Sequence, residues 1–185
     1  MSGSTDALAG TRARELVGLF HHDLDRFGTL APVPAEEMPR DARRLLDHTS
    51  HMTVAMERFH DHPVSLRVVN RRDCPDGRYA REILLHLPDG CVVQHGIVRI
   101  DLAAVTPETA AAIRDEGTPL GRILLVAGLH CDVHDVQLLQ ISTGPHLASL
   151  FQVDVATPTF GRVALIGLAG RPAIELLEII APVLG

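Results

Sequence analysis

The first third of the chain has apolar residues at the spacing of an α-helix. From about Ala7 they recur three or four positions apart at Leu16, Phe20, Leu24 and Phe27, and Gly28 ends the run. This pattern predicts one amphipathic helix, preceded by a disordered N-terminus over residues 1–6. A loop is predicted over 28–39. The broken helical pattern over 41–59 predicts two short helices, the second capped by Thr49 or Ser50.

Beyond Pro63 the apolar period changes from about 3.6 to 2, which is typical of strands. Segments 64–73, 79–86 and 91–101 are separated by the turn sequences Cys74-Pro75-Asp76-Gly77 and Pro88-Asp89-Gly90. They predict three antiparallel strands that follow one another in a meander.

The remaining third of the chain predicts short helices and further strands. Thr106-Pro107-Glu108 gives a cap, an N1 proline and an acidic first turn for a short helix that Gly117 ends. A further apolar stretch opens at 118–121, a strand is predicted over 136–141, and 142–158 is less regular. Segments 161–169 and 172–180 predict a hairpin. The expected fold is α+β: one antiparallel sheet of about six strands with helices packed at one side, forming a single domain over 7–185.

The composition narrows the chemistry that this domain can perform. Its 185 residues include 17 arginines and no lysine, with a net charge of -6. Mechanisms that need a lysine, such as a Schiff base or a P-loop, are therefore excluded. The acidic balance and scattered arginines argue against nucleic acid as a partner. The apolar runs are too short to cross a bilayer and the start is not that of a signal peptide, so we expect a cytoplasmic protein with reduced cysteines.

Two charged residues fall in rows that otherwise face a core. Arg81 shares its strand face with Tyr79, Ile83 and Leu85, and Glu178 shares its face with Ile174, Leu176 and Ile180. Burying either charge alone costs several kcal/mol. The sequence leaves three interpretations open: an ion pair between Arg81 and Glu178, strands that are apolar on both faces, or a ligand site.

Five segments, taken in order, resemble the motifs of the chorismate pyruvate-lyases, or 4-hydroxybenzoate synthases. The similarity extends over about 44–182, and no single motif is specific. The segments are Leu45-Leu46-Asp47 through Met52-Thr53, Tyr79 through Leu85, Thr118 through Arg122, Gly161-Arg162, and Gly170-Arg171-Pro172 through Pro182.

The resemblance implies a six-stranded antiparallel sheet with a closed internal pocket, and it implies which residues line that pocket. Arg81 would bind the carboxylate of the ring, and Glu178 would lie at the hydroxyl end. Met52 and Leu120 would contribute backbone groups, and Arg162 would contact a second carboxylate. The implied reaction is elimination of pyruvate from chorismate, or a close analogue, to give 4-hydroxybenzoate without any cofactor or metal. Glu178 would be the general base and Arg81 the residue that holds the substrate.

The chain also departs from the family. Val163 follows Arg162 where the relatives carry a second arginine, and 130–160 is longer than in the shortest members. The first change could weaken contact with a second carboxylate, and the second could reshape the lid of the pocket.

The sequence gives less support to other kinds of functional site. His130, Cys131, Asp132 and His134 offer metal-ligand types at close spacing, as do the pairs His48/His51 and His60/His62, but none has the spacing of a recognised zinc motif. The cysteines do not have the surroundings of a nucleophile, and no dinucleotide fingerprint is present. The rival class is a binding module of the same fold, as in the effector-sensing domains of some transcriptional regulators, although the chain leaves little room for a helix-turn-helix. The sequence does not determine the oligomeric state.

Overall fold

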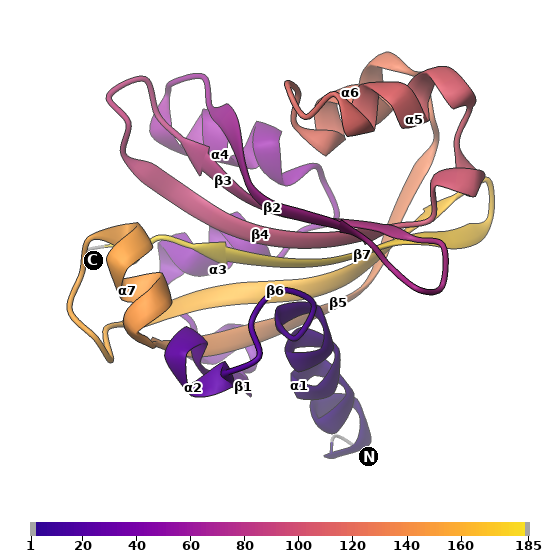
Figure 1. Ribbon diagram of the computed structural model, residues 1–185. Coiled ribbons are helices and arrows are strands. Elements are labelled where there is room, and N and C mark those ends of the chain that lie inside the picture. The colour runs from indigo at the N-terminus through magenta and orange to yellow at the C-terminus, as the bar shows by residue number, and fades with distance from the viewer. Residues whose placement is uncertain (1–2, 184–185) are drawn as a thin grey trace.

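The computed structural model describes residues 3–183 of the chain, and its centre is one seven-stranded antiparallel sheet (Figure 1). The strand order across the sheet is β1-β5-β6-β7-β4-β3-β2. The strands are β1 (Gly28–Pro32), β2 (Ser65–Asp73), β3 (Tyr79–His86), β4 (Val92–Ile100), β5 (Cys131–Thr143), β6 (Pro158–Leu168) and β7 (Arg171–Ile180). The α+β class and the single antiparallel sheet are confirmed, with seven strands instead of about six.

Seven α-helices accompany the sheet. They are α1 (Gly3–Val17), α2 (Leu24–Phe27), α3 (Arg40–Leu46), α4 (Met52–His60), α5 (Pro107–Arg114), α6 (Leu120–Val126) and α7 (Pro145–Phe151). The predicted meander of β2, β3 and β4, the helix capped by Thr106, and the hairpin of β6 and β7 are all present. The hairpin turns at Ala169 and Gly170, which both have positive φ (50° and 77°).

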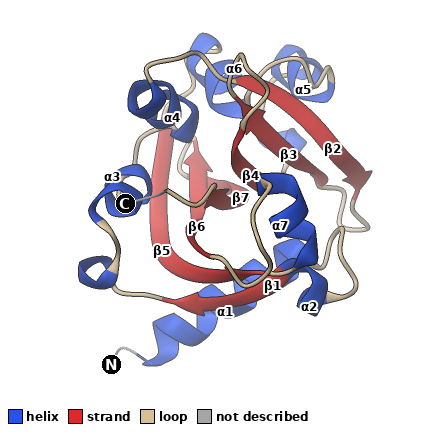
Figure 2. Cartoon of the chain, turned by 90° about the vertical axis from the view of Figure 1, so that its left-hand side faces the viewer, coloured by secondary structure: helices blue, strands red, loops and turns tan. Residues whose placement is uncertain are grey.

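Helices cover both faces of the sheet, whereas the sequence predicted them at one side (Figures 1 and 2). We call the face that carries Arg81, Ile83 and Leu85 the front face and the opposite one the back face. The front face packs against α3 and α4 through Met52, Met56 and Leu85, and against α5 and α6 through residues such as Ile113 and Leu124. The back face packs against α1, α2 and α7 through residues such as Leu16, Phe27, Leu147 and Leu177.

Two local predictions were wrong at the N-terminal end. The single helix expected from Ala7 to Phe27 is two helices: α1 begins earlier, at Gly3, and ends at Val17, and α2 starts separately because Asp23 caps it by accepting a hydrogen bond from Asp25 N. Residues 1–2 of the expected disordered segment lie outside the described residues. Residues 28–32 form edge strand β1 instead of a loop, because their backbone pairs with β5.

Two more differences lie further along. The N-cap of α4 is His51, without a side-chain hydrogen bond, and not Thr49 or Ser50. The irregular region over 142–158 contains α7, which starts at Pro145. A helix of seven residues is too short for its apolar period to stand out in the sequence.

Candidate functional site

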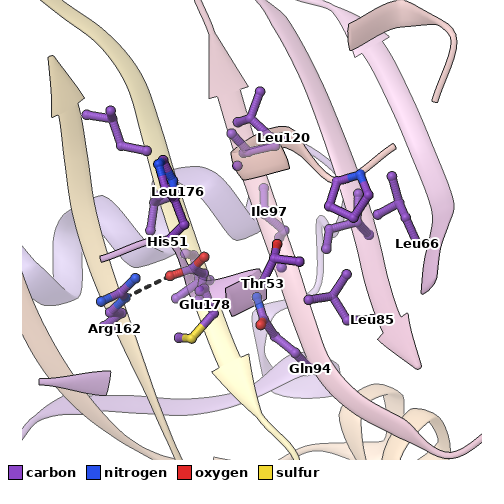
Figure 3. A pocket seen from close by; sticks show the side chains of 18 of the residues that line it. His51, Thr53, Leu66, Leu85, Gln94, Ile97, Leu120, Arg162, Leu176 and Glu178 are labelled. Atoms are coloured by element: carbon purple, nitrogen blue, oxygen red, sulfur yellow. Dashed lines mark hydrogen bonds and ion pairs between the residues drawn. The ribbon is translucent and has the colours of Figure 1, made fainter. Parts of the chain in front are cut away.

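A cavity of about 80 Å³ lies between the front face of the sheet and the first turns of α4 and α6. All five residues predicted to bind substrate line this cavity: Met52, Arg81, Leu120, Arg162 and Glu178. They come from segments far apart in the sequence, and the packing of two helices on the sheet brings them together. Most of the remaining lining is apolar, with Leu66, Ile83, Leu85, Val133, Ile166 and Leu176 (Figure 3).

Arg81 is the least compensated charge of this cavity. Its side chain is buried, with the residue 1% exposed, and among the described residues no carboxylate oxygen lies within 4.0 Å of it. Its Nη1 donates to the carbonyl oxygen of Ile113 (3.1 Å), near the C-terminal end of α5, while its Nε has no hydrogen-bond partner. A buried guanidinium in this state has both charge and a donor left for a ligand.

The nearest electrostatic influences on Arg81 do not neutralise it. Burial lowers the pKa of the Arg81 guanidinium, and Tyr79 and Glu116 oppose that shift. The Glu116 carboxylate is already occupied, because it accepts from Tyr79 Oη (2.7 Å) and from Arg71 Nη1 (2.8 Å). An arginine keeps its proton at neutral pH even in such surroundings, so Arg81 presents a full positive charge to the cavity.

Glu178 is paired with Arg162 and not with Arg81. Arg162 Nε donates to Glu178 Oε2 at 2.7 Å, and Figure 3 shows the two side chains meeting across neighbouring strands β6 and β7. Arg162 Nη1 also donates to the carbonyl oxygens of Leu46 (3.2 Å) and His48 (2.6 Å). The suggested Arg81–Glu178 ion pair is therefore wrong, and much of the hydrogen-bonding capacity of Arg162 is used within the protein.

The charges around the cavity follow from these contacts. Two arginines and one glutamate line it, and one arginine neutralises the glutamate. His48, next to Arg162, has its pKa lowered by burial and then by the Arg162 charge, which favours the neutral ring. The cavity thus has one unbalanced positive charge, at Arg81, within a mostly apolar wall.

The first turn of α4 opens on this cavity, and α6 begins beside it. Met52 and Thr53 line the cavity at the start of α4, where no side chain caps the helix. The first N–H groups of a helix have no partner within it and carry partial positive charge. Gly121 allows the start of α6 to approach closely, since a Cβ there would lie 3.2 Å from His51 Cβ.

Two lining residues that sequence analysis missed lie on β4. Gln94 is buried (2% exposed) and its Oε1 has no hydrogen-bond partner, so it offers a second unused polar group. Gly96 lies between Ile83 and Glu178 in the sheet, and a Cβ there would come within 3.3 Å of the Ile83 side chain. The alternation that identified Arg81 on β3 also holds for β4, where it gives the row Gln94, Gly96 and Val98. Applied to that strand, it would have indicated Gln94 and Gly96 as residues that face the cavity.

The histidine segments that the sequence suggested as metal ligands do not form a cluster in the described part of the chain. His134 Nδ1 lies 3.4 Å from Asp132 Oδ2, and both side chains are exposed. The His60 ring packs edge-to-face against Phe59, and His48 contacts Arg162 and Ser50. In residues 3–183, no helix is both long and apolar enough to span a membrane.

Comparison with known proteins finds likeness in structure only. No family model matches the chain, and no curated protein is significantly similar in sequence. The effector domain of PhnF from Mycobacterium smegmatis has a TM-score of 0.54 and 14% identity, over 71% of this chain and 88% of that one. A candidate transcriptional regulator from Streptomyces coelicolor gives 0.50 and 14%, over 65% and 88%.

The ligand-binding domain of a candidate GntR-family transcriptional regulator from Bordetella bronchiseptica gives a TM-score of 0.49 and 14% identity, over 63% of this chain and 85% of that one. At these identities the similarity is one of fold. The resemblance to the chorismate lyases stays a prediction.

Proposed function

We propose that the front-face cavity binds a small organic monoanion, such as an aromatic monocarboxylate, with its charged group on Arg81. The observation that carries this proposal is the buried Arg81 guanidinium, which has no carboxylate partner among the described residues and an unpaired Nε. A carboxylate accepts two parallel hydrogen bonds from a guanidinium, and the apolar wall suits a ring or short hydrocarbon body. The similarity in fold to the effector domain of PhnF supports a binding role.

Isothermal titration calorimetry with a pair of nearly isosteric ligands tests this proposal. Benzoate or 4-hydroxybenzoate should bind, and the neutral 4-hydroxybenzamide should bind at least about 100-fold more weakly, because a charge-assisted pair of hydrogen bonds is lost. Arg81→Met should abolish the preference for the acid. Arg67→Met is the matched control, since Arg67 is an exposed arginine on the neighbouring strand β2. Equal affinity for acid and amide in the native chain would refute the proposal.

A second candidate function is a chorismate lyase-like elimination in the same cavity. It is favoured by the position of Glu178, which lies on the same face as Arg81, two strands and two residues away. This register gives a Cα separation of about 12 Å, a span that two side chains and a small ring can fill together. Glu178 would take the proton from the hydroxyl-bearing ring carbon, while the C–O bond to the enolpyruvyl group breaks. The leaving enolate then gains a proton on its methylene carbon to become pyruvate, and the ring becomes 4-hydroxybenzoate.

Incubation with chorismate, followed by chromatography of both products, separates the two functions. Formation of pyruvate and 4-hydroxybenzoate in equal amounts above the spontaneous rate would support the lyase. Glu178→Gln should then lose turnover while it still binds 4-hydroxybenzoate. Binding of the acid without any product would leave the binding module as the function of this cavity.

A further inference from the structure

Three histidines and a glutamate converge on the back face of the sheet, opposite the cavity. Glu82 neighbours Arg81 on β3 but points to the other face, and its residue is fully buried. His21 Nε2 and His95 Nε2 each lie 2.7 Å from Glu82 Oε1, and His146 Nε2 lies 3.4 Å from the same oxygen. His21 belongs to the connection between α1 and α2, His95 to β4 and His146 to α7.

We propose that His21 Nε2, His146 Nε2 and a Glu82 carboxylate oxygen form a binding site for a zinc-class divalent cation. These three ligand atoms all lie within 4.8 Å of one another. Two imidazoles and a carboxylate are a donor set that zinc accepts, with metal–ligand distances of about 2.0–2.2 Å. Ligand atoms at those distances around a tetrahedral ion are about 3.4 Å apart, so small side-chain movements admit the metal.

A shielded nitrogen of the cluster has no well-formed hydrogen bond, which favours its use as a metal ligand. His146 Nε2 is shielded from solvent, and although it lies 3.4 Å from Glu82 Oε1, it makes no hydrogen bond of acceptable geometry among the described residues. His95, which is fully buried, has an unpaired Nδ1 as well. Buried polar atoms without partners are uncommon and costly. A cation would use the free nitrogen of His146.

The surroundings hold the ligands in the orientation that a metal site needs. Asn70 Nδ2 donates to Glu82 Oε2 at 2.7 Å, which turns Oε1 toward the histidines. Asn70 reaches this face because β2 has a bulge between Val68 and Asn70, which shifts the alternation of its side chains. Such contacts to a ligating carboxylate orient it and tune the metal.

The packing of the aromatic rings fits the same site. The centroids of the His21 and His146 rings lie 4.4 Å apart, and the buried Phe27 packs against both rings. This packing holds the two imidazoles side by side, next to the Glu82 carboxylate.

One side of the cluster remains open. The side chains of His21 and His146 are 16% and 28% exposed, whereas those of Glu82 and His95 are fully buried. Three protein ligands with an accessible fourth position are typical of zinc sites that bind a water molecule or a ligand group. The site would join α7 and the α1–α2 connection to the central strands, which lie together on this face in Figure 2.

Zinc and cobalt titrations of the full chain, after treatment with a chelator, test this proposal. Calorimetry should give one tight Zn²⁺ equivalent, and Co²⁺ should show the intense visible absorption of a four-coordinate ion. Mg²⁺ should not bind, because it prefers oxygen ligands. His21→Ala and His146→Ala should each lose the tight equivalent, and Asn70→Ala should weaken it by about 10- to 100-fold.

Two control variants and one structural readout keep the result interpretable. His22→Ala removes the exposed neighbour of His21, and His134→Ala removes an exposed histidine of the segment 130–134; both should keep the tight equivalent. Circular dichroism checks that each variant is folded, and Glu82→Gln offers a variant of unchanged size that should also lose the metal. Absence of a tight equivalent in the native chain, or its survival in folded His146→Ala, would overturn the site and leave a purely structural hydrogen-bond network.

Discussion

Replacing either of two buried arginines on the front face by methionine should change the free energy of unfolding, in opposite directions for the two sites. Arg81 and Arg162 are each 1% exposed. Arg162 pairs with Glu178 and donates to two carbonyl oxygens, whereas Arg81 makes one hydrogen bond within residues 3–183, to Ile113 O. We expect Arg81→Met to raise the free energy of unfolding of the ligand-free protein and Arg162→Met to lower it.

The magnitudes follow from the contacts. Removing an unpaired buried charge should raise the free energy of unfolding by several kcal/mol. Loss of the hydrogen bond to Ile113 O should lower it by about 1–2 kcal/mol. The net stabilisation from Arg81→Met should be about 1–3 kcal/mol. Arg162→Met leaves the Glu178 carboxylate without its partner, and this should cost about 2–4 kcal/mol, reduced from the fully buried case because the Glu178 side chain is 14% exposed.

Urea denaturation followed by circular dichroism measures both effects, in the absence of any ligand. The double variant Arg162→Met/Glu178→Met should recover most of the lost stability, because it also removes the Glu178 carboxylate that the single variant leaves unpaired. If Arg81→Met destabilised the protein as much as Arg162→Met, then Arg81 would have a structural role, and the assignment of its charge to a ligand would be refuted.

Three further predictions concern single sites. Gly96→Val should fill the floor of the cavity and weaken binding of an aromatic acid by more than 10-fold, because even a Cβ there would come within 3.3 Å of Ile83; unchanged calorimetric affinity would contradict the placement of the ligand. Tyr79 is the only tyrosine in a chain without tryptophan, and burial with the Glu116 hydrogen bond raises its pKa to about 12, so its ultraviolet titration should have a midpoint near 12. Since this pKa is raised on folding, the stabilisation is present below about pH 10 and is lost as the pH rises toward 12; a midpoint near 10 would show that the contact is absent. Finally, a thiol reagent should modify exposed Cys91 before buried Cys74, whose pKa burial raises, and mass spectrometry of the labelled peptides gives the order.

The sequence by itself determined most of the strands and two of the charged residues that line the cavity. Period-2 alternation placed β2, β3, β4 and the final hairpin, and the same alternation identified Arg81 and Glu178 as charges on core-facing rows. That information is local, because neighbouring side chains in a strand must point to opposite faces. Alternation thus singled out Arg81 and Glu178, whereas the pocket itself and the residues Met52, Leu120 and Arg162 were implied by the resemblance to the chorismate lyases.

Only the tertiary structure decided which charges meet. Arg162 reaches Glu178 because β6 and β7 pair in a particular register, and this leaves Arg81 without a carboxylate partner in the described part of the chain. The histidine cluster around Glu82 brings together the α1–α2 connection, β4 and α7, which are distant in the sequence. It also depends on a bulge in β2 that no local sequence pattern predicts. Hydrophobic periodicity specifies the face on which a residue lies. The strand order, the register and the helices on each face then determine the residue it contacts.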